Sequence, residues 1–337
     1  MASIRKHSEK LAEQIFERMF TFEDLMKIAP QAVQTLLTEV PDKFDMILTP
    51  DSPHYVSLPG ISVLIGGMWI MNLSYWGFNQ YIIQRTLAAK DLAEAQKGIV
   101  FAAFLKVLMP VIVVLPGIAA VLLLPDLSKP DQAYPQLLSM MPSGIKGLIF
   151  AALVAAILSS LASMTNSVAT IFTMDIYSQF KKDQSQQHYV KVGRIVSLVA
   201  LVIAVFTAKP LLGEFDQAFQ YIQEFTGFFT PGIVVLFLLG MFWARTTATA
   251  ALVAAISSAV LSWIFKVALP EMPFMDRVGL VFLSCLALAV LVTLFQRQGK
   301  HPQAVELRDI SFETRPSFNL YAVLITLIVA AFYIAWW

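Results

Sequence analysis

The chain has 337 residues, of which 57% are hydrophobic and 14% are charged, and its formal net charge is +1. Soluble domains carry about 25% charged residues, so this composition excludes an ordinary soluble domain. It predicts an all-α polytopic protein embedded in a lipid bilayer. The nearly neutral balance indicates no nucleic-acid partner. A single cysteine, Cys285, excludes a disulfide within the chain and is expected to be a packing residue.

The first segment, residues 9–40, alternates apolar and polar residues at helical spacing, and Pro30 interrupts the pattern. It predicts one or two amphipathic helices at the membrane surface. The chain therefore divides into an extracytoplasmic amphipathic segment, 1–56, and a transmembrane domain, 57–337. The apolar positions that share one face are Leu11, Ile15, Phe16, Met19 and Phe20.

Eight apolar stretches follow, each long enough to cross a bilayer, which takes about 20 helical residues. Proline or glycine interrupts three of them, at Gly66-Gly67, at Pro110 and Pro116, and at Pro231-Gly232. Such breaks are either ordinary kinks or helices that bend around a transport site. The predicted spans are 58–84, 98–124, 145–175, 189–208, 217–243, 246–269, 273–296 and 318–337.

Lysine and arginine predict the orientation, because cytoplasmic loops are enriched in both. With the N-terminus outside, the outside loops hold only Lys129, Lys146, Lys209 and Arg277. The C-terminus is then also extracytoplasmic in a multi-pass protein of the cell membrane. The inside loops hold twelve basic residues: Arg85, Lys90, Lys97, Lys181, Lys182, Lys191, Arg194, Arg245, Arg297, Lys300, Arg308 and Arg315.

This orientation leaves the first segment outside, although "MASIRKHSEKLAEQIF" lacks the apolar region of a signal peptide. A preceding transmembrane helix would explain its export. We therefore expect the chain to be the C-terminal portion of a longer protein.

Polar and aromatic residues gather within the first predicted span, in "MNLSYWGFNQYIIQRTLAAK" (71–90). Asn72, Tyr75, Trp76 and Asn79 are spaced so that a continuous helix would place them on one face. A polar stripe inside a membrane faces something other than lipid. It either binds a sugar, whose apolar face stacks on a ring while amides bind its hydroxyls, or joins neighbouring helices.

Lys106 lies about 12 Å beyond the inside end of the second span, at 1.5 Å per residue. It either snorkels to the headgroups or faces a wet cavity, since a charge at that depth costs about 3 kcal/mol. Lys266 lies near the outside end of its span, where snorkelling explains it.

The third span contains small residues at intervals of four, in "AAILSSLASMTNSVATIFTMDIY". Such faces either allow close helix packing or, through their hydroxyls, supply the oxygen ligands that hard cations prefer. The two rows are Ala152, Ala156 and Ser160, and Ala155, Ser159 and Ser163.

The fifth span begins with "FQYIQEFTGFFTPG", in which amides and a carboxylate alternate with aromatic rings. This pattern predicts either the outer wall of a binding cavity or an interfacial belt. The polar positions are Gln220, Gln223 and Glu224, and the aromatic ones are Phe219, Tyr221 and Phe225.

Taken together, these motifs, with "AQKGIVFAAFLK", resemble the sodium/solute symporter family, and within it the bacterial sodium/galactose members. The resemblance runs from about residue 30 to the C-terminus. It implies the second inverted repeat, plus trailing helices, of a five-plus-five symporter fold, with the first inverted repeat absent. Such proteins bind substrate at mid-membrane and alternate access between the two sides.

The resemblance also implies residue roles. Asn72 and Tyr75 would contact the sugar, with Tyr75 stacking under the ring as the inner gate and Trp76 beside it. Lys106 and Gln223 would bind sugar hydroxyls. The remaining roles are an outer gate at Phe219 and sodium ligands at the carbonyl of Ala156 and the hydroxyls of Ser159 and Ser160.

Two positions depart from the family pattern: Ser74 stands where a tyrosine is expected, and Thr165 replaces an aliphatic residue. The expected function is sodium-coupled symport of a monosaccharide such as galactose or glucose, with sodium as coupling ion, no other cofactor and no enzymatic activity. The alternatives are symport of another solute (inositol, or proline-like) and a truncated chain that transports nothing without the missing N-terminal half. A Ser–Lys hydrolase using Lys106 with Ser159 or Ser160 lacks the expected nucleophile elbow.

Overall fold

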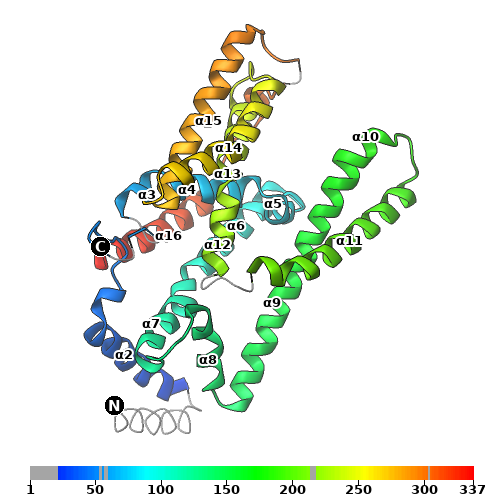
Figure 1. Ribbon diagram of the computed structural model, residues 1–337. Helices are drawn as coiled ribbons and strands as arrows, with labels where there is room; N and C mark the ends of the chain where they lie inside the picture. Colours follow the sequence, from blue (N-terminus) through cyan, green and yellow to red (C-terminus); the bar gives the residue numbers. More distant parts are fainter. Residues whose placement is uncertain (1–21, 53–54, 57–59, 213–217, 303) are drawn as a thin grey trace. The chain divides into compact units, whose positions relative to one another are not determined.

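A computed structural model describes the chain over five ranges, and every regular element in them is helical (Figure 1). The apolar residues of the predicted N-terminal stripe, Leu11 to Phe20, lie outside these ranges. The next helix, α2 (Phe22–Glu39), runs through Pro30 without a break, so the proline does not divide this part into two helices. The described ranges are 22–52, 55–56, 60–212, 218–302 and 304–337.

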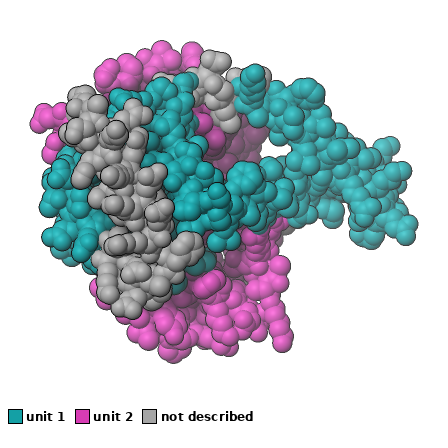
Figure 2. Space-filling view, turned by 90° about the horizontal axis from the view of Figure 1, so that it is seen from below, with its two compact units in different colours: residues 1–46, 102–217, 328–337 teal, residues 47–101, 218–327 magenta. Residues whose placement is uncertain are grey.

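The chain forms two compact units, coloured separately in Figure 2. Unit 1 comprises residues 1–46, 102–217 and 328–337, and unit 2 comprises 47–101 and 218–327. The boundary falls within two helices, α6 (Leu92–Val107) and α16 (Pro316–Ala335).

Unit 1 contains the third and fourth predicted spans, which pack against each other as α9 and α11. The described elements of unit 1 are α2, η1 (Pro41–Lys43), η3 (Pro110–Val114), α7 (Leu115–Leu123), η4 (Pro130–Gln132), α8 (Ala133–Ser139), α9 (Ser143–Thr170), η5 (Ile171–Tyr177), α10 (Ser178–Phe180) and α11 (Gln186–Leu212).

Unit 2 contains three packed helices, α13, α14 and α15, with the short helices of the first predicted span beside them. Its described elements are α3 (Ile61–Ile65), α4 (Gly67–Leu73), η2 (Ser74–Phe78), α5 (Gln80–Leu87), α12 (Ala218–Gly227), α13 (Thr230–Phe242), α14 (Ala248–Ala268), α15 (Phe274–Gln296) and η6 (Leu307–Asp309).

The core of unit 2 lies where α13, α14 and α15 meet. Small residues on α14 allow the three helices to approach closely, as is usual for helix pairs in membranes. Cys285 is fully buried there, which confirms its predicted packing role. A second group of buried residues, Ile70, Val234 and Val278, attaches α4 to α13 and α15. The central residues are Val235, Ala250, Ala254, Val281, Cys285 and Ala289.

Seven of the eight predicted spans have a helical counterpart in the described residues. Among the described residues six helices are long and apolar enough to cross a membrane, and the pair α12 and α13, bent by 43° at its break, makes seven if the pair is counted as one span. The six are Leu92–Leu123, Ser143–Phe180, Gln186–Lys209, Ala248–Ala268, Phe274–Gln296 and Pro316–Ala335.

The first predicted span differs, because it is not one continuous helix. It is divided into α3, α4, η2 and α5, with the interruption expected at Gly66-Gly67 and a second one, at Asn79, that was not expected. The backbone leaves the helical region at Gly66 (φ −108°, ψ −104°) and again at Asn79 (φ −83°, ψ 116°). Glycine permits the first of these breaks because it has no Cβ.

Candidate functional site

The predicted sugar-binding stripe lies where helical geometry changes. After α4 the chain continues as a π-helix, η2, which contains Tyr75 and Trp76. Their rings pack edge to face, with centroids 5.3 Å apart and planes at 81°. The hydroxyl of Tyr81 donates to the hydroxyl of Tyr75 at 3.0 Å. Short π-helical turns occur frequently at functional sites, because they redirect side chains within a helix.

The expectation that Asn72, Tyr75, Trp76 and Asn79 share one face of a single helix is wrong at Asn79. That residue has an extended backbone and caps α5, and its side-chain oxygen accepts from the backbone N–H of Tyr81. A capping residue lies outside the helical repeat, so sequence spacing no longer determines its direction. Asn72 remains in α4 and donates to the carbonyl oxygen of Met68 at 2.9 Å.

The α3–α4 segment is attached to the first turn of α15 by a very close backbone contact. A Cβ atom placed on Gly67 would lie 2.0 Å from the carbonyl oxygen of Met275. One residue further along α15, the carboxylate of Asp276 accepts a hydrogen bond from the hydroxyl of Ser62 at 2.9 Å. The first turn of α15 therefore determines where the segment that leads to Tyr75 begins.

The break between α12 and α13 has an identifiable cause. In a continuous helix the N–H of Gly232 would bond the carbonyl of Phe228. Here the Ser258 hydroxyl stands between them, since it accepts from Gly232 N at 3.0 Å and donates to Phe228 O at 2.8 Å. Pro231 supplies no N–H of its own. A side chain inserted into the ladder of helical hydrogen bonds is one of the recognised causes of a sharp bend.

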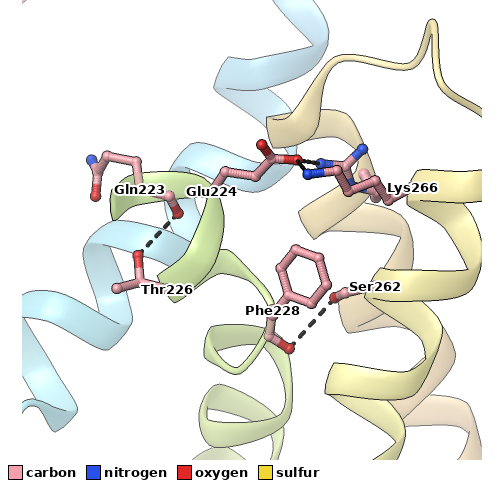
Figure 3. A network of polar contacts seen from close by, with 7 residues as sticks. Gln223, Glu224, Thr226, Phe228, Ser262 and Lys266 are labelled. Carbon is pink, nitrogen blue, oxygen red and sulfur yellow. Dashed lines mark hydrogen bonds and ion pairs between the residues drawn. The ribbon is translucent and has the colours of Figure 1, made fainter. Parts of the chain in front are cut away.

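This insertion requires a glycine at 232, where a Cβ atom would lie 2.6 Å from the carbonyl oxygen of Ala254 and 2.7 Å from the Cβ of Ser258. The hydroxyl of Ser262 also points to Phe228 O, at 3.5 Å (Figure 3). The freed backbone groups of the bend are thus satisfied inside the protein, as they must be at membrane depth.

We expect Ser258→Ala to lower the free energy of unfolding by about 1–3 kcal/mol, because the buried N–H of Gly232 loses its partner and the part-buried carbonyl of Phe228 keeps only the longer bond from Ser262. Thermal unfolding in detergent measures this change. Ser284→Ala is the matched control, because the Ser284 hydroxyl bonds the Leu280 carbonyl of its own helix. Equal stability of both variants would contradict the role given to Ser258.

The two predicted site residues on α12 lie on the bent span. Phe219 is 73% exposed. The carbonyl of Gln223 accepts a hydrogen bond from the Thr226 hydroxyl at 2.9 Å, and the Gln223 side chain points away from the neighbouring Glu224 (Figure 3). Glu224 points toward Lys266 and accepts a salt bridge from its Nζ atom at 3.0 Å.

The interpretation of Lys266 as a purely snorkelling lysine is therefore incomplete. Its ammonium group pairs with a carboxylate and also lies 5.9 Å from the centre of the Phe228 ring. Buried Arg277, counted as a loop residue from the sequence, also pairs with Glu224, so that Glu224, Lys266 and Arg277 form one charged cluster. Sequence reasoning missed this cluster because its members come from three helices that are distant along the chain.

The remaining predicted residues belong to unit 1. Lys106 is an exposed residue in the last turn of α6, just before the π-helical turn η3 that begins at Pro110. Lys106 and the predicted sodium ligands lie in unit 1, whereas Tyr75 and Trp76 lie in unit 2.

The three predicted sodium ligands lie on α9, and all are exposed there: Ala156, Ser159 and Ser160. The buried residues of α9 are instead Ser163, Ser167 and Ala169. The Ser163 hydroxyl donates to the carbonyl of Ser159 at 3.0 Å. Of the small residues that suggested close packing, only Ser163 is buried.

The apolar helices, the bent span and the irregular helix with its aromatic pair define the class of protein: a multi-pass helical membrane protein. A model of the sodium:solute symporter family matches residues 16–257. The chain belongs to this family.

Named relatives agree with this assignment. The chain is 46% identical to the sodium/glucose cotransporter of Vibrio parahaemolyticus over 324 residues, which cover 90% of the chain and 60% of that protein. It is 40% identical to the human sodium/myo-inositol cotransporter 2 over 213 residues, 58% of the chain and 31% of that protein. An uncharacterized symporter of Escherichia coli K12, YidK, is 34% identical over 226 residues, covering 66% of the chain and 39% of that protein. The chain thus spans no more than about 60% of the length of these relatives.

Proposed function

We propose that the protein takes part in sodium-coupled symport of a monosaccharide, such as galactose or glucose, across the cell membrane. The observation that carries the substrate class is the partly exposed pair of Tyr75 and Trp76, which meet edge to face in the irregular turn after α4. Aromatic faces stack on the apolar face of a pyranose, and the nearby amide of Asn72 offers polar groups for hydroxyls.

The relatives support this substrate class and keep one alternative open. One is named for glucose and another for myo-inositol, and both compounds are six-membered rings carrying several hydroxyl groups. Lys106 and Gln223 would bind such hydroxyls, and Phe219 would close the site from outside. Uptake of labelled galactose, glucose and inositol, compared side by side, distinguishes these substrates.

Sodium is the proposed coupling ion, held by the backbone carbonyl of Ala156 and the hydroxyls of Ser159 and Ser160. These hard oxygen ligands suit an alkali cation, and both hydroxyl-bearing residues are exposed on α9. Sodium that binds one state of the transporter better than the other shifts the population toward that state. It thereby raises the observed affinity for a sugar that prefers the same state, and sugar raises sodium affinity by the same factor. The membrane potential adds about 2.3 kcal/mol per charge per 100 mV to the free energy that drives sodium inward.

Ser160→Ala tests the ion site. We expect the sodium concentration for half-maximal uptake to rise about tenfold, which corresponds to about 1.4 kcal/mol of lost binding free energy. Uptake of labelled sugar into proteoliposomes at graded sodium concentrations measures it. Thr165→Val is the control, because the Thr165 hydroxyl bonds carbonyl groups of its own helix. An unchanged sodium dependence in Ser160→Ala would exclude this residue as a ligand.

A second candidate function follows from the length of the chain relative to its relatives: a membrane module that does not transport alone. Uptake by the chain alone is compared with uptake by the chain joined to the N-terminal segment of the Vibrio relative, which supplies the remaining part. Robust sodium-dependent uptake by the chain alone would exclude the second candidate. Uptake by the joined form only would support it.

A further inference from the structure

One carboxylate joins three helices of unit 2. Oε1 of Glu224 on α12 accepts from Nη2 of Arg277 on α15 at 2.5 Å and pairs with Nζ of Lys266 on α14 at 3.0 Å. The side chain of Arg277 is 7% exposed and that of Glu224 is 25% exposed, whereas Lys266 is 49% exposed. We call these three residues the Glu224 clamp.

The contact with Arg277 dominates the clamp. A guanidinium removed from water cannot easily lose its proton, so removal of the Glu224 carboxylate leaves the buried charge of Arg277 without this compensation. The contact with Lys266 is more exposed and correspondingly weaker. The position of α12 relative to α15 therefore depends mainly on the Glu224–Arg277 pair.

Gly227 provides the second close contact between α12 and α15. A Cβ atom on Gly227 would lie 3.2 Å from Cγ2 of Val278, the residue after Arg277. Glu224 and Gly227 are three positions apart in the sequence and therefore lie on the same side of α12. Gln223, the predicted sugar ligand, precedes Glu224 and points away from the clamp (Figure 3).

The same turn of α15 also holds the aromatic segment. Met275 contacts Gly67, Asp276 accepts from Ser62, and Arg277 donates to Glu224, so three consecutive residues bind α4, α3 and α12 in turn. The α3–α4 segment leads directly to Tyr75. The first turn of α15 is thus the common support of both unit 2 segments that carry predicted sugar ligands.

We propose that Glu224 is a positioning residue for sugar binding: through Arg277 and Lys266 it holds α12 in the orientation that directs Gln223 toward the substrate. The sugar-binding part rests on the proposed function, whereas the clamp itself does not. Loss of the clamp allows α12 to pivot about the bend between α12 and α13, where the Ser258 hydroxyl of α14 is inserted.

A distance measurement tests the clamp without any transport. Spin labels are placed at two exposed positions, Ile222→Cys on α12 and Leu294→Cys on α15, in the full chain with its single cysteine removed by Cys285→Ala. In nanodiscs, double electron–electron resonance should give a narrow distance distribution for this background. Glu224→Gln should broaden or shift it.

Two further variants separate the clamp from general damage. The exchange Glu224→Arg with Arg277→Glu keeps opposite charges in contact and, combined with Lys266→Gln so that the new arginine does not meet a second cation, should restore the narrow distribution. Glu271→Gln removes an exposed carboxylate from the connection between α14 and α15 and should change nothing. An unchanged distribution in Glu224→Gln overturns the proposal, as does equal broadening in Glu271→Gln. If the exchanged pair does not accumulate in the membrane, Glu224→Asp should recover part of the narrow distribution, and no recovery overturns the proposal.

Uptake then tests the consequence for the sugar, in whichever form of the protein transports. Displacement of Gln223 should raise the KM for sugar in Glu224→Gln about tenfold while the maximal rate per folded transporter stays nearly constant. A purely structural role would lower the amount of active transporter at an unchanged KM. A broadened distance distribution with an unchanged KM for sugar would mean that the clamp only stabilises the structure, and would overturn the positioning role. The absence of uptake from every form contradicts the proposed function and leaves the distance result to decide the clamp.

Discussion

Replacing Gly67 with alanine is expected to destabilise the protein by about 3 kcal/mol, the upper end of the usual cost of overpacking. The new Cβ atom would lie 2.0 Å from the carbonyl oxygen and 2.7 Å from the carbonyl carbon of Met275. These are backbone atoms, which cannot turn aside as a flexible side chain can. Either α4 or the first turn of α15 must move, and we expect a lower midpoint in thermal unfolding in detergent.

Gly240→Ala is the matched control, because beyond the adjoining backbone of α13 no atom of the described residues lies within 4 Å of the Cβ that it would add. Alanine is favoured over glycine within a helix by about 1 kcal/mol, so this variant should be neutral or more stable. A loss of stability in Gly67→Ala with no loss or a gain in Gly240→Ala would support the close contact at Gly67. A Gly67→Ala protein as stable as the parent would contradict it.

Replacing Tyr75 with alanine is expected to reduce the affinity for sugar about thirtyfold, which corresponds to about 2 kcal/mol, typical of an aromatic residue that dominates a binding site. The substitution removes the ring proposed to stack under the sugar and also the edge-to-face contact with Trp76. Competition of unlabelled galactose with labelled sugar, in the form of the protein that transports, measures the loss.

Two conservative variants separate the ring from its hydroxyl. Tyr75→Phe keeps the ring and should retain most of the affinity, with a loss of threefold or less, equivalent to about 0.6 kcal/mol. Tyr81→Phe removes the hydroxyl that donates to Tyr75 and should have a similarly small effect. If Tyr75→Ala bound sugar as well as the parent, Tyr75 would not be the stacking residue.

The positions of most spans could be predicted from the sequence because hydropathy acts locally. A run such as 273–296 must become a helix in a membrane, where every backbone group needs a partner within its own segment. The structure agrees, with α15 at Phe274–Gln296. Over 58–84 the sequence indicated the interruption at Gly66-Gly67 but not the one at Asn79, because hydropathy averaged over a window does not detect a change of backbone direction.

The candidate site shows the same limit. Tyr75 and Trp76 are consecutive in the sequence, so their edge-to-face contact needs no helical periodicity and follows from their place in η2. The spacing was misleading at Asn79, where the chain leaves the helix to cap α5. The roles of Lys106, Gln223 and the sodium ligands remain predictions that the proposed experiments address.

Composition and periodicity determined that this protein is a multi-pass helical membrane protein, since lipid admits few other solutions. The tertiary structure alone decided which hydroxyl enters the bend of α12 and α13, and which charges meet. Ser258 is 26 residues from Gly232, and Arg277 is 53 residues from Glu224. Contacts of that sequence separation depend on how helices pack, and no local pattern in the sequence encodes them.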